Sequence, residues 1–200
     1  APRGARVLVK VPPDLFEPRD EVLSLLRNTP SCLFTDIDGT LAPIRSDPTS
    51  VAVSSGTREA LAWLADKISV VAITGRSVTD ARRILGLESL VYSGNHGAEW
   101  LDRGAKYVEP SAQRYVTRIH ELALRATREL EIEQLFVEDK GPTLSIHYRN
   151  APNPSIARDV VFDFLATAAS EMNVQEGKMV AEVRPPLPLS KGTTVQSFVR

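Results

Sequence analysis

The chain has 200 residues, in which 24 Lys and Arg stand against 25 Asp and Glu, so its formal net charge at pH 7 is −1. That balance argues against a nucleic-acid-binding protein, which normally carries a basic patch, and the single cysteine excludes a disulfide framework. No apolar run approaches the roughly 20 residues that cross a bilayer, and residues 1–10 are basic without the apolar core of a signal peptide. We therefore expect a cytoplasmic globular protein that binds neither nucleic acid nor membrane.

The amino-terminal half predicts alternating strands and helices. Its proline-rich residues 1–30 predict a leader or linker with a short helix at Arg19–Arg27. Apolar runs predict three strands: Ser31–Asp36, Ile68–Thr74 and Leu90–Tyr92. Helical spacing and capping residues predict two helices between them: Ser54–Lys67, and Ser77 to about Leu85 with Gly86 as its stop. Such alternation indicates a parallel α/β sheet over residues 31–102, with Cys32, Trp63 and Trp100 as core or sheet residues.

From about Arg103 the pattern changes to that of a smaller α+β unit. The expected order over residues 103–184 is helix, strand, strand, helix, strand, strand. The segments assigned are helices at Ser111–Glu131 and from Pro154 to about Met172, and strands at Leu135–Glu138, Pro142–Arg149 and Met179–Arg184, the last after a Glu176–Gly177 turn. Residues 185–200 are expected to return to the first unit, with a helix from Lys191.

Two carboxylates two residues apart follow the first predicted strand, in the segment Asp36-Ile37-Asp38-Gly39-Thr40. We predict that Asp36 attacks a phosphorus atom to form an aspartyl phosphate. Asp38 would protonate the leaving oxygen and then deprotonate the attacking water. Gly39 would let backbone amides approach the phosphoryl oxygens. We expect Mg²⁺ on Asp36 and Asp38, because a cation lets an anionic carboxylate approach an anionic phosphate.

Two simpler interpretations of this segment are a surface turn and a calcium-binding loop. A calcium loop needs further oxygen ligands downstream and lies between helices, whereas here an apolar strand precedes and Leu41-Ala42-Pro43-Ile44 follows. Thr74 and Asn95 also follow predicted strands, and ligands bind at the carboxyl ends of parallel strands. This convergence favours a catalytic site.

These residues resemble the haloacid-dehalogenase superfamily of phosphohydrolases. The strand that ends in Asp36-x-Asp38-Gly39-Thr40 is similar to its first motif, Thr74 in Ile73-Thr74-Gly75-Arg76 to its second, and Lys191-Gly192 to its third. The resemblance implies a Rossmann-like parallel core, a phosphoryl-binding hydroxyl on Thr74, and a Lys191 that neutralises charge on the nucleophile. It also implies that residues 103–184 form an inserted α+β cap domain.

Longer segments narrow the resemblance to the trehalose-6-phosphate phosphatase family. They are Ala72–Ser77, Ser93–Glu99, Leu144–Arg149 and Gly177–Pro185. The resemblance implies that Glu138 with Lys140, and Lys178 with Glu182, bind the hydroxyl groups of the sugar. It also implies substrate-binding residues near the phosphate or at the seam between core and cap: Arg76, Asn95, His96 and Arg149, beside His147.

The family's activity is the Mg²⁺-dependent hydrolysis of trehalose 6-phosphate to trehalose and phosphate. Its fourth, acidic motif completes the metal site roughly twenty or more residues beyond the third, and none occurs between Lys191 and Arg200. We therefore expect a fragment with weak Mg²⁺ binding and little activity. The alternatives are a phosphatase for sucrose phosphate or mannosyl phosphoglycerate, and a non-catalytic module that partners a trehalose-phosphate synthase.

Overall fold

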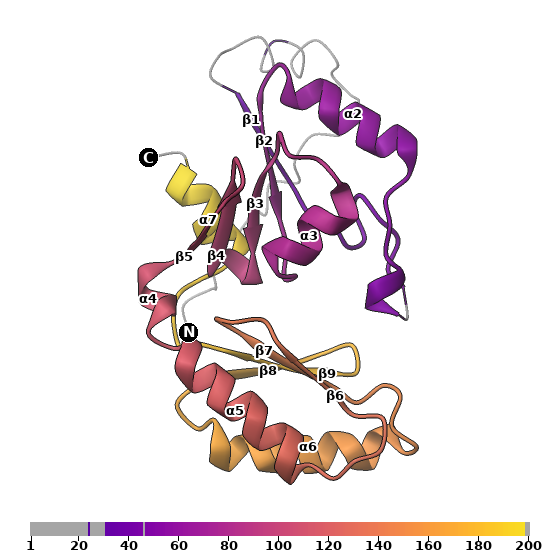
Figure 1. Cartoon of the computed structure of the whole chain (residues 1–200), viewed down its shortest axis with the longest axis vertical. Helices are drawn as coiled ribbons and strands as arrows, with labels where there is room; N and C mark the ends of the chain where they lie inside the picture. The colour runs from indigo at the N-terminus through magenta and orange to yellow at the C-terminus, as the bar shows by residue number, and fades with distance from the viewer. Residues whose placement is uncertain (1–23, 25–30, 46, 199–200) are drawn as a thin grey trace, which may run out of the picture. The chain divides into compact units, whose positions relative to one another are not determined.

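The computed structural model describes residue 24, residues 31–45 and residues 47–198 (Figure 1). The described residues from 33 onward belong to one compact unit. The helix expected at Arg19–Arg27 lies outside the described residues except for Ser24, which is helical. Within these described ranges, no helix is both long and apolar enough to cross a membrane.

The first of two sheets has five strands in the order β1-β2-β3-β4-β5. Its strands and the helices around them are β1 (Cys32–Thr35), the 3-10 turn η1 (Pro48–Ser50), α2 (Ser55–Ala65), β2 (Ser69–Ile73), α3 (Val78–Leu85), β3 (Val91–Gly94), the 3-10 turn η2 (Asn95–Gly97), β4 (Glu99–Asp102), β5 (Ala105–Val108) and α7 (Lys191–Phe198). Strands β2 and β3 pair in parallel around the crossover helix α3, as the α/β prediction requires. The antiparallel hairpin of β4 and β5 was not expected, and β5 extends this sheet beyond residue 103.

Helices cover both faces of the first sheet. Successive residues of β4 point to opposite faces, so two neighbouring residues of this strand contact helices on different sides. Leu101 packs into the apolar core with Val78 of α3, whereas the Trp100 ring lies 5.1 Å from the Phe198 ring of α7. Figure 1 accordingly shows α2 and α3 on one side of the sheet and α7 on the other. Trp100 is thus the sheet residue that the sequence predicts.

Helix ends follow the local signals in the sequence. The Ser54 hydroxyl accepts a hydrogen bond from the Thr57 amide, and the Ser77 hydroxyl accepts one from the Asp80 amide. Each thereby satisfies a backbone donor that has no partner within the first turn of its helix. Gly86 adopts a left-handed conformation (φ 66°) and ends α3, as predicted.

Two predictions of core residues are wrong. Trp63 is 60% exposed, because it stands two positions, about 200°, around α2 from the buried Leu61. Cys32 is also exposed, at the start of β1, which is the first strand in the order of its sheet. Apolar composition alone therefore did not identify the buried face at either place.

The second sheet has four antiparallel strands in the order β6-β7-β9-β8. Its strands and helices are α4 (Pro110–Gln113), α5 (Val116–Glu129), β6 (Phe136–Asp139), β7 (Leu144–His147), α6 (Pro154–Ala168), β8 (Asn173–Gly177) and β9 (Val180–Arg184). Helices α5 and α6 cover one face (Figure 1), where Leu144, Ile146 and Val183 join the helices' apolar residues. Because side chains alternate along a strand, Glu138, Ser145 and Glu182 point to the opposite face and lie side by side across three strands.

Two boundaries in this part differ from the prediction. The single helix expected at Ser111–Glu131 is divided into α4 and α5, since the Tyr115 amide donates to the Ala112 carbonyl and closes a tight turn between them. The turn expected at Glu176–Gly177 lies at Lys178–Met179, where Met179 takes a left-handed φ of 63°.

Each sheet has its own apolar core. Buried residues between 37 and 101 form one cluster, and those between 119 and 183 form another. A sheet and the helices that cover it pack around one apolar core, so the two sheets with their helices have two cores. The proposed limits of core and cap at residues 31–102, 103–184 and 185–200 remain a prediction.

Candidate active site

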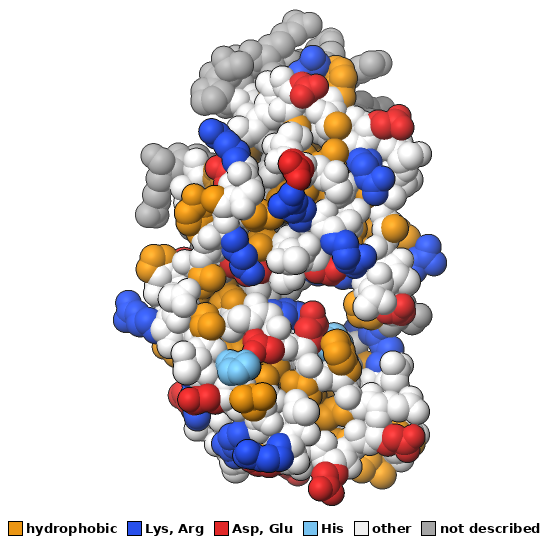
Figure 2. Space-filling model, viewed as in Figure 1, with side chains coloured by type: hydrophobic (Ala, Val, Ile, Leu, Met, Phe, Trp, Pro, Cys, Tyr) orange, Lys and Arg blue, Asp and Glu red, His pale blue; other side chains and the backbone are white. Residues whose placement is uncertain are grey.

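A cavity of about 550 Å³ is lined by polar side chains from both sheets. The wall formed by the first sheet and its connections contains Asp36, Asp38, Asp47, Pro48, Thr49, Thr74, Gly75, Arg76, Asp80, His96 and Lys191. The wall from the second sheet contains Gln134, Phe136, Glu138, Lys140, His147, Arg149, Asn150 and Glu182. Figure 2 shows the surface hollowed here, with acidic and basic side chains around the rim.

Asp36 and Lys191 meet in this cavity although 155 positions separate them in the chain. One Asp36 oxygen accepts a hydrogen bond from the Ile37 amide at 2.8 Å, and the other accepts from Lys191 Nζ at 2.5 Å. Thr74 follows β2 directly, and its hydroxyl accepts from the Arg76 amide at 3.1 Å. Each of the three motifs that the sequence analysis compared with the superfamily thus places side chains in one cavity: Asp36 and Asp38, Thr74 and Arg76, and Lys191.

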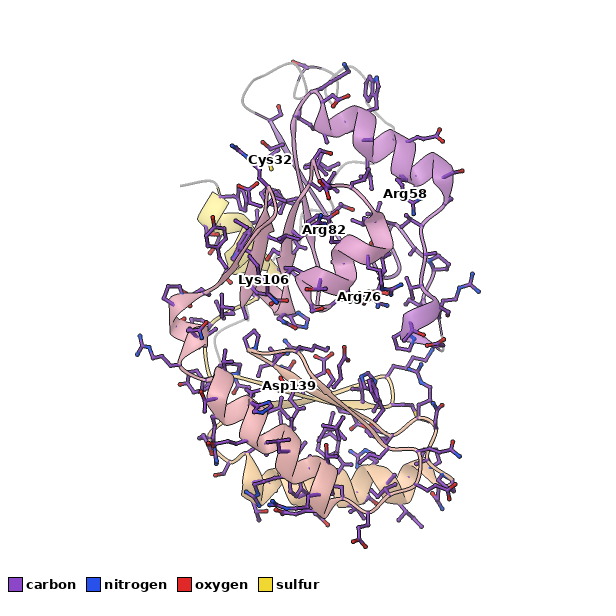
Figure 3. The ribbon with its side chains drawn as sticks, in the orientation of Figure 1. Cys32, Arg58, Arg76, Arg82, Lys106 and Asp139 are labelled. Carbon is purple, nitrogen blue, oxygen red and sulfur yellow. The ribbon has the colours of Figure 1, made fainter. Side chains whose placement is uncertain are left out.

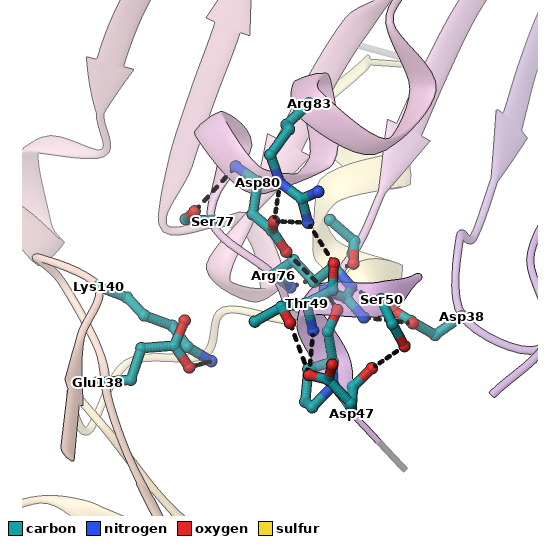
Figure 4. A network of polar contacts seen from close by, with 12 residues as sticks. Asp38, Asp47, Thr49, Ser50, Arg76, Ser77, Asp80, Arg83, Glu138 and Lys140 are labelled. Carbon is teal, nitrogen blue, oxygen red and sulfur yellow. Dashed lines mark hydrogen bonds and ion pairs between the residues drawn. The ribbon is translucent and has the colours of Figure 1, made fainter. Parts of the chain in front are cut away.

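Arg76 links Asp38 to Asp80 (Figure 4). Its Nε and Nη2 donate to the two Asp38 oxygens at 2.7 and 2.8 Å, and its Nη1 donates to Asp80 at 2.5 Å. Such paired contacts use the planar fork of the guanidinium group. Burial alone would lower the pKa of Arg76, but the two carboxylates outweigh it and raise that pKa, so Arg76 stays charged.

Arg76 lies beside the start of α3 (Figure 3). The first residue of that helix is hydrogen-bonded to the buried carboxylate of Glu99. Glu99 of β4 is fully buried, and its Oε1 accepts from the Val78 amide at 2.7 Å. Its Oε2 pairs with Lys106 Nζ of β5 at 2.8 Å, which offsets the cost of burying the charge. The hairpin that the sequence analysis missed therefore supports the segment that carries Arg76.

Gly39 adopts the left-handed φ of 84° that its turn requires. Its amide donates to the Ala42 carbonyl at 2.8 Å, and the amides of Thr40, Leu41 and Ala42 all donate to the Ile37 carbonyl. These donors are therefore used within the turn. The expectation that the Gly39 turn offers them to a phosphoryl group is not supported.

Glu138 on β6 lies between two basic side chains of the cavity. His147 Nε2 is 3.0 Å from Glu138 Oε2, and Lys140 Nζ is 3.8 Å from the same oxygen. Burial alone would raise the pKa of Glu138, but the hydrogen bond from His147 and the charge of Lys140 outweigh it and lower that pKa. Glu138 thus presents an ionised acceptor to the cavity.

Glu182 on β9 has partners from both walls. Its Oε2 lies 3.6 Å from His96 Nε2 and 2.5 Å from Arg184 Nη2. The His96 ring lowers the pKa of Glu182 to about 2, burial opposes that shift, and Arg184 adds to it. Glu182 is therefore an anion at neutral pH.

Three residues predicted to bind substrate, Gly39, Lys178 and Asn95, are not among the residues that line the cavity. Lys178 is exposed in the turn between β8 and β9, where its carbonyl accepts from Arg149 at 2.7 Å. Glu182 forms its ion pair with Arg184, and the role of Lys178 and Glu182 in binding sugar hydroxyls stays a prediction. Asn95 is buried, and its amide group contacts Thr143 and the Lys140 carbonyl.

The sequence analysis missed several cavity residues, and two of them carried a usable signal. Asp80 lies four positions after Arg76, the spacing at which charges on a helical turn meet. Phe136 lies two positions before Glu138 on β6, and residues two apart share a face of a strand. Gln134 and Asn150 lie in connections, where no periodic pattern marks them.

Asp36 and Asp38 are the carboxylates that the sequence predicts as ligands for Mg²⁺. Within the described part of the chain, no group of three or more His, Cys, Asp or Glu side chains could hold a metal ion. Mg²⁺ in phosphate-processing sites is often held by one or two carboxylates together with substrate phosphate and water. Asp36 and Asp38 fit that arrangement, because both are carboxylates and both line the cavity. Each would contact Mg²⁺ in addition to its basic partner, Lys191 or Arg76.

Comparison with known proteins places these observations in a family context. The family model described as trehalose-phosphatase matches residues 34–200. The trehalose-phosphate phosphatase of Mycobacterium leprae is 30% identical over 165 residues, which are 82% of this chain and 38% of that protein. Across the first curated relatives that it matches, the chain spans between 14% and 63% of their length.

Solved structures support the fold. A trehalose-6-phosphate phosphatase related protein superposes with a TM-score of 0.72 at 22% identity, covering 84% of this chain and 73% of that one. The C-terminal domain of the Candida albicans trehalose-6-phosphate phosphatase gives 0.70 at 24% identity, covering 91% and 66%. These likenesses confirm the predicted α/β fold class.

Proposed function

This chain belongs to the trehalose-phosphatase family, and from that premise we propose that it hydrolyses trehalose 6-phosphate to trehalose and inorganic phosphate. The observation that carries the proposal is the contact of Lys191 Nζ with Asp36 at 2.5 Å inside the cavity. A lysine that neutralises a carboxylate next to a phosphate site is suited to a nucleophile that must approach an anion.

The two walls of the cavity suit the two halves of this substrate. Arg76 and Lys191 supply positive charge beside Asp36 and Thr74, where a phosphoryl group would bind. Glu138, Lys140 and Glu182 supply acceptors and donors on the second sheet, where sugar hydroxyls would bind. His147 holds Glu138 in position through its 3.0 Å contact.

In the proposed mechanism, an Asp36 oxygen attacks phosphorus and the bond from phosphorus to the sugar oxygen breaks. Asp38 enters this step with a proton taken from water and with one of its two oxygens released from Arg76. It gives that proton to the sugar oxygen, so trehalose leaves as an alcohol and an aspartyl phosphate remains. Asp38 then takes a proton from water, which attacks the phosphorus and releases inorganic phosphate from Asp36. The hydrogen bonds from Arg76 orient Asp38, and charge on the phosphoryl oxygens is matched by Lys191 and Arg76.

Mg²⁺ would be held by the Asp36 and Asp38 carboxylates together with substrate oxygens and water. When bound, it supplies positive charge that offsets the repulsion between carboxylate and phosphate. A cytoplasmic location and a partnership with a trehalose-phosphate synthase remain predictions.

Phosphate release from trehalose 6-phosphate tests the proposal. We expect Mg²⁺-dependent turnover that is low, as the sequence analysis predicts, and that is lost after chelation with EDTA and in Asp36→Asn. Asp66→Asn is the matched control, because Asp66 is an exposed residue at the end of α2, away from the cavity lining. Phosphate release by Asp36→Asn at the original rate would exclude Asp36 as the nucleophile.

A substrate panel separates the alternatives. Preference for sucrose phosphate or mannosyl phosphoglycerate over trehalose 6-phosphate would identify a different sugar-phosphate phosphatase. No turnover of any phosphate ester, combined with binding to a trehalose-phosphate synthase, would indicate a non-catalytic module.

A further inference from the structure

Two consecutive non-glycine residues at the end of β3 adopt left-handed backbone conformations. Asn95 has a φ of 49° and His96 a φ of 58°. Left-handed non-glycine residues are uncommon, and each persists only where its surroundings hold it in place. The contacts of this pair therefore show what the turn is built to hold.

The backbone of the pair is bonded to the segment that follows β2. The Asn95 amide donates to the Arg76 carbonyl at 2.8 Å, and the His96 amide donates to the Thr74 carbonyl at 3.1 Å. Because Thr74 and Arg76 line the phosphate end of the cavity, the turn is bonded directly to that end.

The Asn95 side chain reaches the second sheet instead of the cavity. Its Oδ1 accepts from the Thr143 hydroxyl at 2.8 Å, and its Nδ2 donates to the Lys140 carbonyl at 3.2 Å. Asn95 is 1% exposed and Thr143 6% exposed, so water competes little for these bonds. The Lys140 amide in turn donates to the Thr143 carbonyl and closes the turn between β6 and β7.

The neighbouring His96 makes a second link to the same sheet. Its ring lies over Gly75, where a Cβ would come within 2.7 Å of Nε2, and Nε2 lies 3.6 Å from Glu182 on β9. Two adjacent residues of one turn thus lie against two places on the second sheet, the turn between β6 and β7 and strand β9.

We propose that Asn95 and Thr143 are positioning residues that set the separation between the phosphate end of the cavity, at Thr74 and Arg76, and its sugar end, at Glu138 and Lys140. The hydrogen bond between them fixes the turn of β6 and β7, which carries Lys140 directly. This inference rests on the proposed function for the identity of the substrate. It replaces the expectation that Asn95 binds substrate.

Thr143→Val tests the bond with little change of shape, and Thr143→Ser keeps the hydroxyl. Two substrates are compared: trehalose 6-phosphate, which spans both ends, and acetyl phosphate, which needs only the phosphate end. We expect Thr143→Val to raise KM for trehalose 6-phosphate about tenfold, the effect of one buried group left without a partner, and to leave kcat/KM for acetyl phosphate unchanged. Thr143→Ser should restore the original KM.

Asn95→Gly removes the same bond from the other side, and glycine accepts the positive φ. Asn95→Gly also removes the bond from Nδ2 to the Lys140 carbonyl. The double variant Asn95→Gly/Thr143→Val should therefore raise KM no more than Asn95→Gly alone, because Asn95→Gly already removes the bond that Thr143→Val removes. Equal losses on both substrates, or no change on either, would overturn the inference.

Hydrogen exchange of the amides at residues 140–143 provides a readout that needs no turnover. We expect faster exchange there in Thr143→Val than in Thr143→Ser. If the unmodified chain does not hydrolyse trehalose 6-phosphate, the proposed function fails, and the exchange result alone decides the inference: equal rates in the two variants would refute it.

Discussion

Replacing Asp80 with Asn tests whether the Arg76 network depends on a residue outside the motifs. Asp80 accepts one hydrogen bond from Arg76 Nη1 at 2.5 Å and two from Arg83 at 2.7 and 3.0 Å. Asn keeps the shape of Asp but removes the charge, and only its single oxygen still accepts. Arg76 would then keep Asp38 and the Pro48 carbonyl as its partners.

The loss of unfolding free energy in Asp80→Asn depends on how exposed each of these contacts is. The Arg76 side chain is 14% exposed and that of Asp80 29%, so their charged hydrogen bond is partly shielded from water. Hydrogen bonds to charged groups contribute about 1.5–3 kcal/mol. The Arg83 side chain is 52% exposed, and its pair with Asp80 contributes at most about 1 kcal/mol. We therefore expect Asp80→Asn to lower the free energy of unfolding by about 2 kcal/mol.

Thermal unfolding followed by circular dichroism measures this loss. For a chain of this size, about 2 kcal/mol corresponds to a fall in Tm of about 4–8 °C. Arg83→Gln is the control, since it removes the exposed pair with Asp80 and a long contact with the Thr49 carbonyl, and it should lower Tm by at most about 2–4 °C. The reasoning is refuted if Arg83→Gln costs as much as Asp80→Asn, or if Asp80→Asn leaves Tm unchanged.

Three further predictions concern the sugar wall, acid stability and backbone packing. Phe136 is 58% exposed in the cavity and stacks on the His147 ring, with 5.5 Å between the ring centroids. Phe136→Ala should therefore raise KM for trehalose 6-phosphate about threefold to tenfold, while Phe136→Tyr does not. Steady-state kinetics measure this, and an equal KM in the two variants would show that stacking is unimportant. Because the pKa of Glu182 falls from 4.5 to about 2 on folding, its contribution to stability is complete above pH 4.5 and is lost as pH falls towards 2. Urea unfolding across that range should show a shallower loss in Glu182→Gln, and equal slopes would contradict the assignment. A Cβ on Gly94 would lie 2.6 Å from the Val78 backbone nitrogen, whereas one on Gly56 meets nothing within 4 Å. Gly94→Ala should therefore lower the free energy of unfolding by about 1–3 kcal/mol or more. Gly56→Ala is the control and should not lower it, and thermal unfolding measures both.

Local signals explain which parts of the fold were predictable. Ser54, Ser77 and Gly86 act on backbone groups within a few residues, so the sequence predicts the ends of α2 and α3. The hairpin of β4 and β5 lacks such a signal, because its turn places Arg103 at a φ of 46° beside Gly104. Such turns favour Asn or Asp at the first position, so an arginine there conceals the hairpin.

The residues of the candidate site also include some that the sequence predicts and some that it does not. Asp36, Asp38, Thr74 and Lys191 stand in short motifs, and the structure places them in one cavity. The true neighbours of Asn95 were not predictable, since Thr143 lies 48 positions along the chain and in the turn of a different sheet, and only the folded chain brings the two together. Buried Glu99 was hidden for a similar reason, because its partner Lys106 stands on an unpredicted strand.

The alternation of side chains across β6, β7 and β9 limits how this cavity can change during evolution. Phe136 and Glu138 face the cavity while Val137 packs with the apolar core, and the same alternation holds along β7. Deleting or inserting one residue within β6 would shift the strand by one position and exchange its two faces. Charged groups would then enter the core and apolar ones the cavity. Substrate preference on this wall can therefore drift through single replacements at alternate positions, while changes of length are confined to the connecting turns.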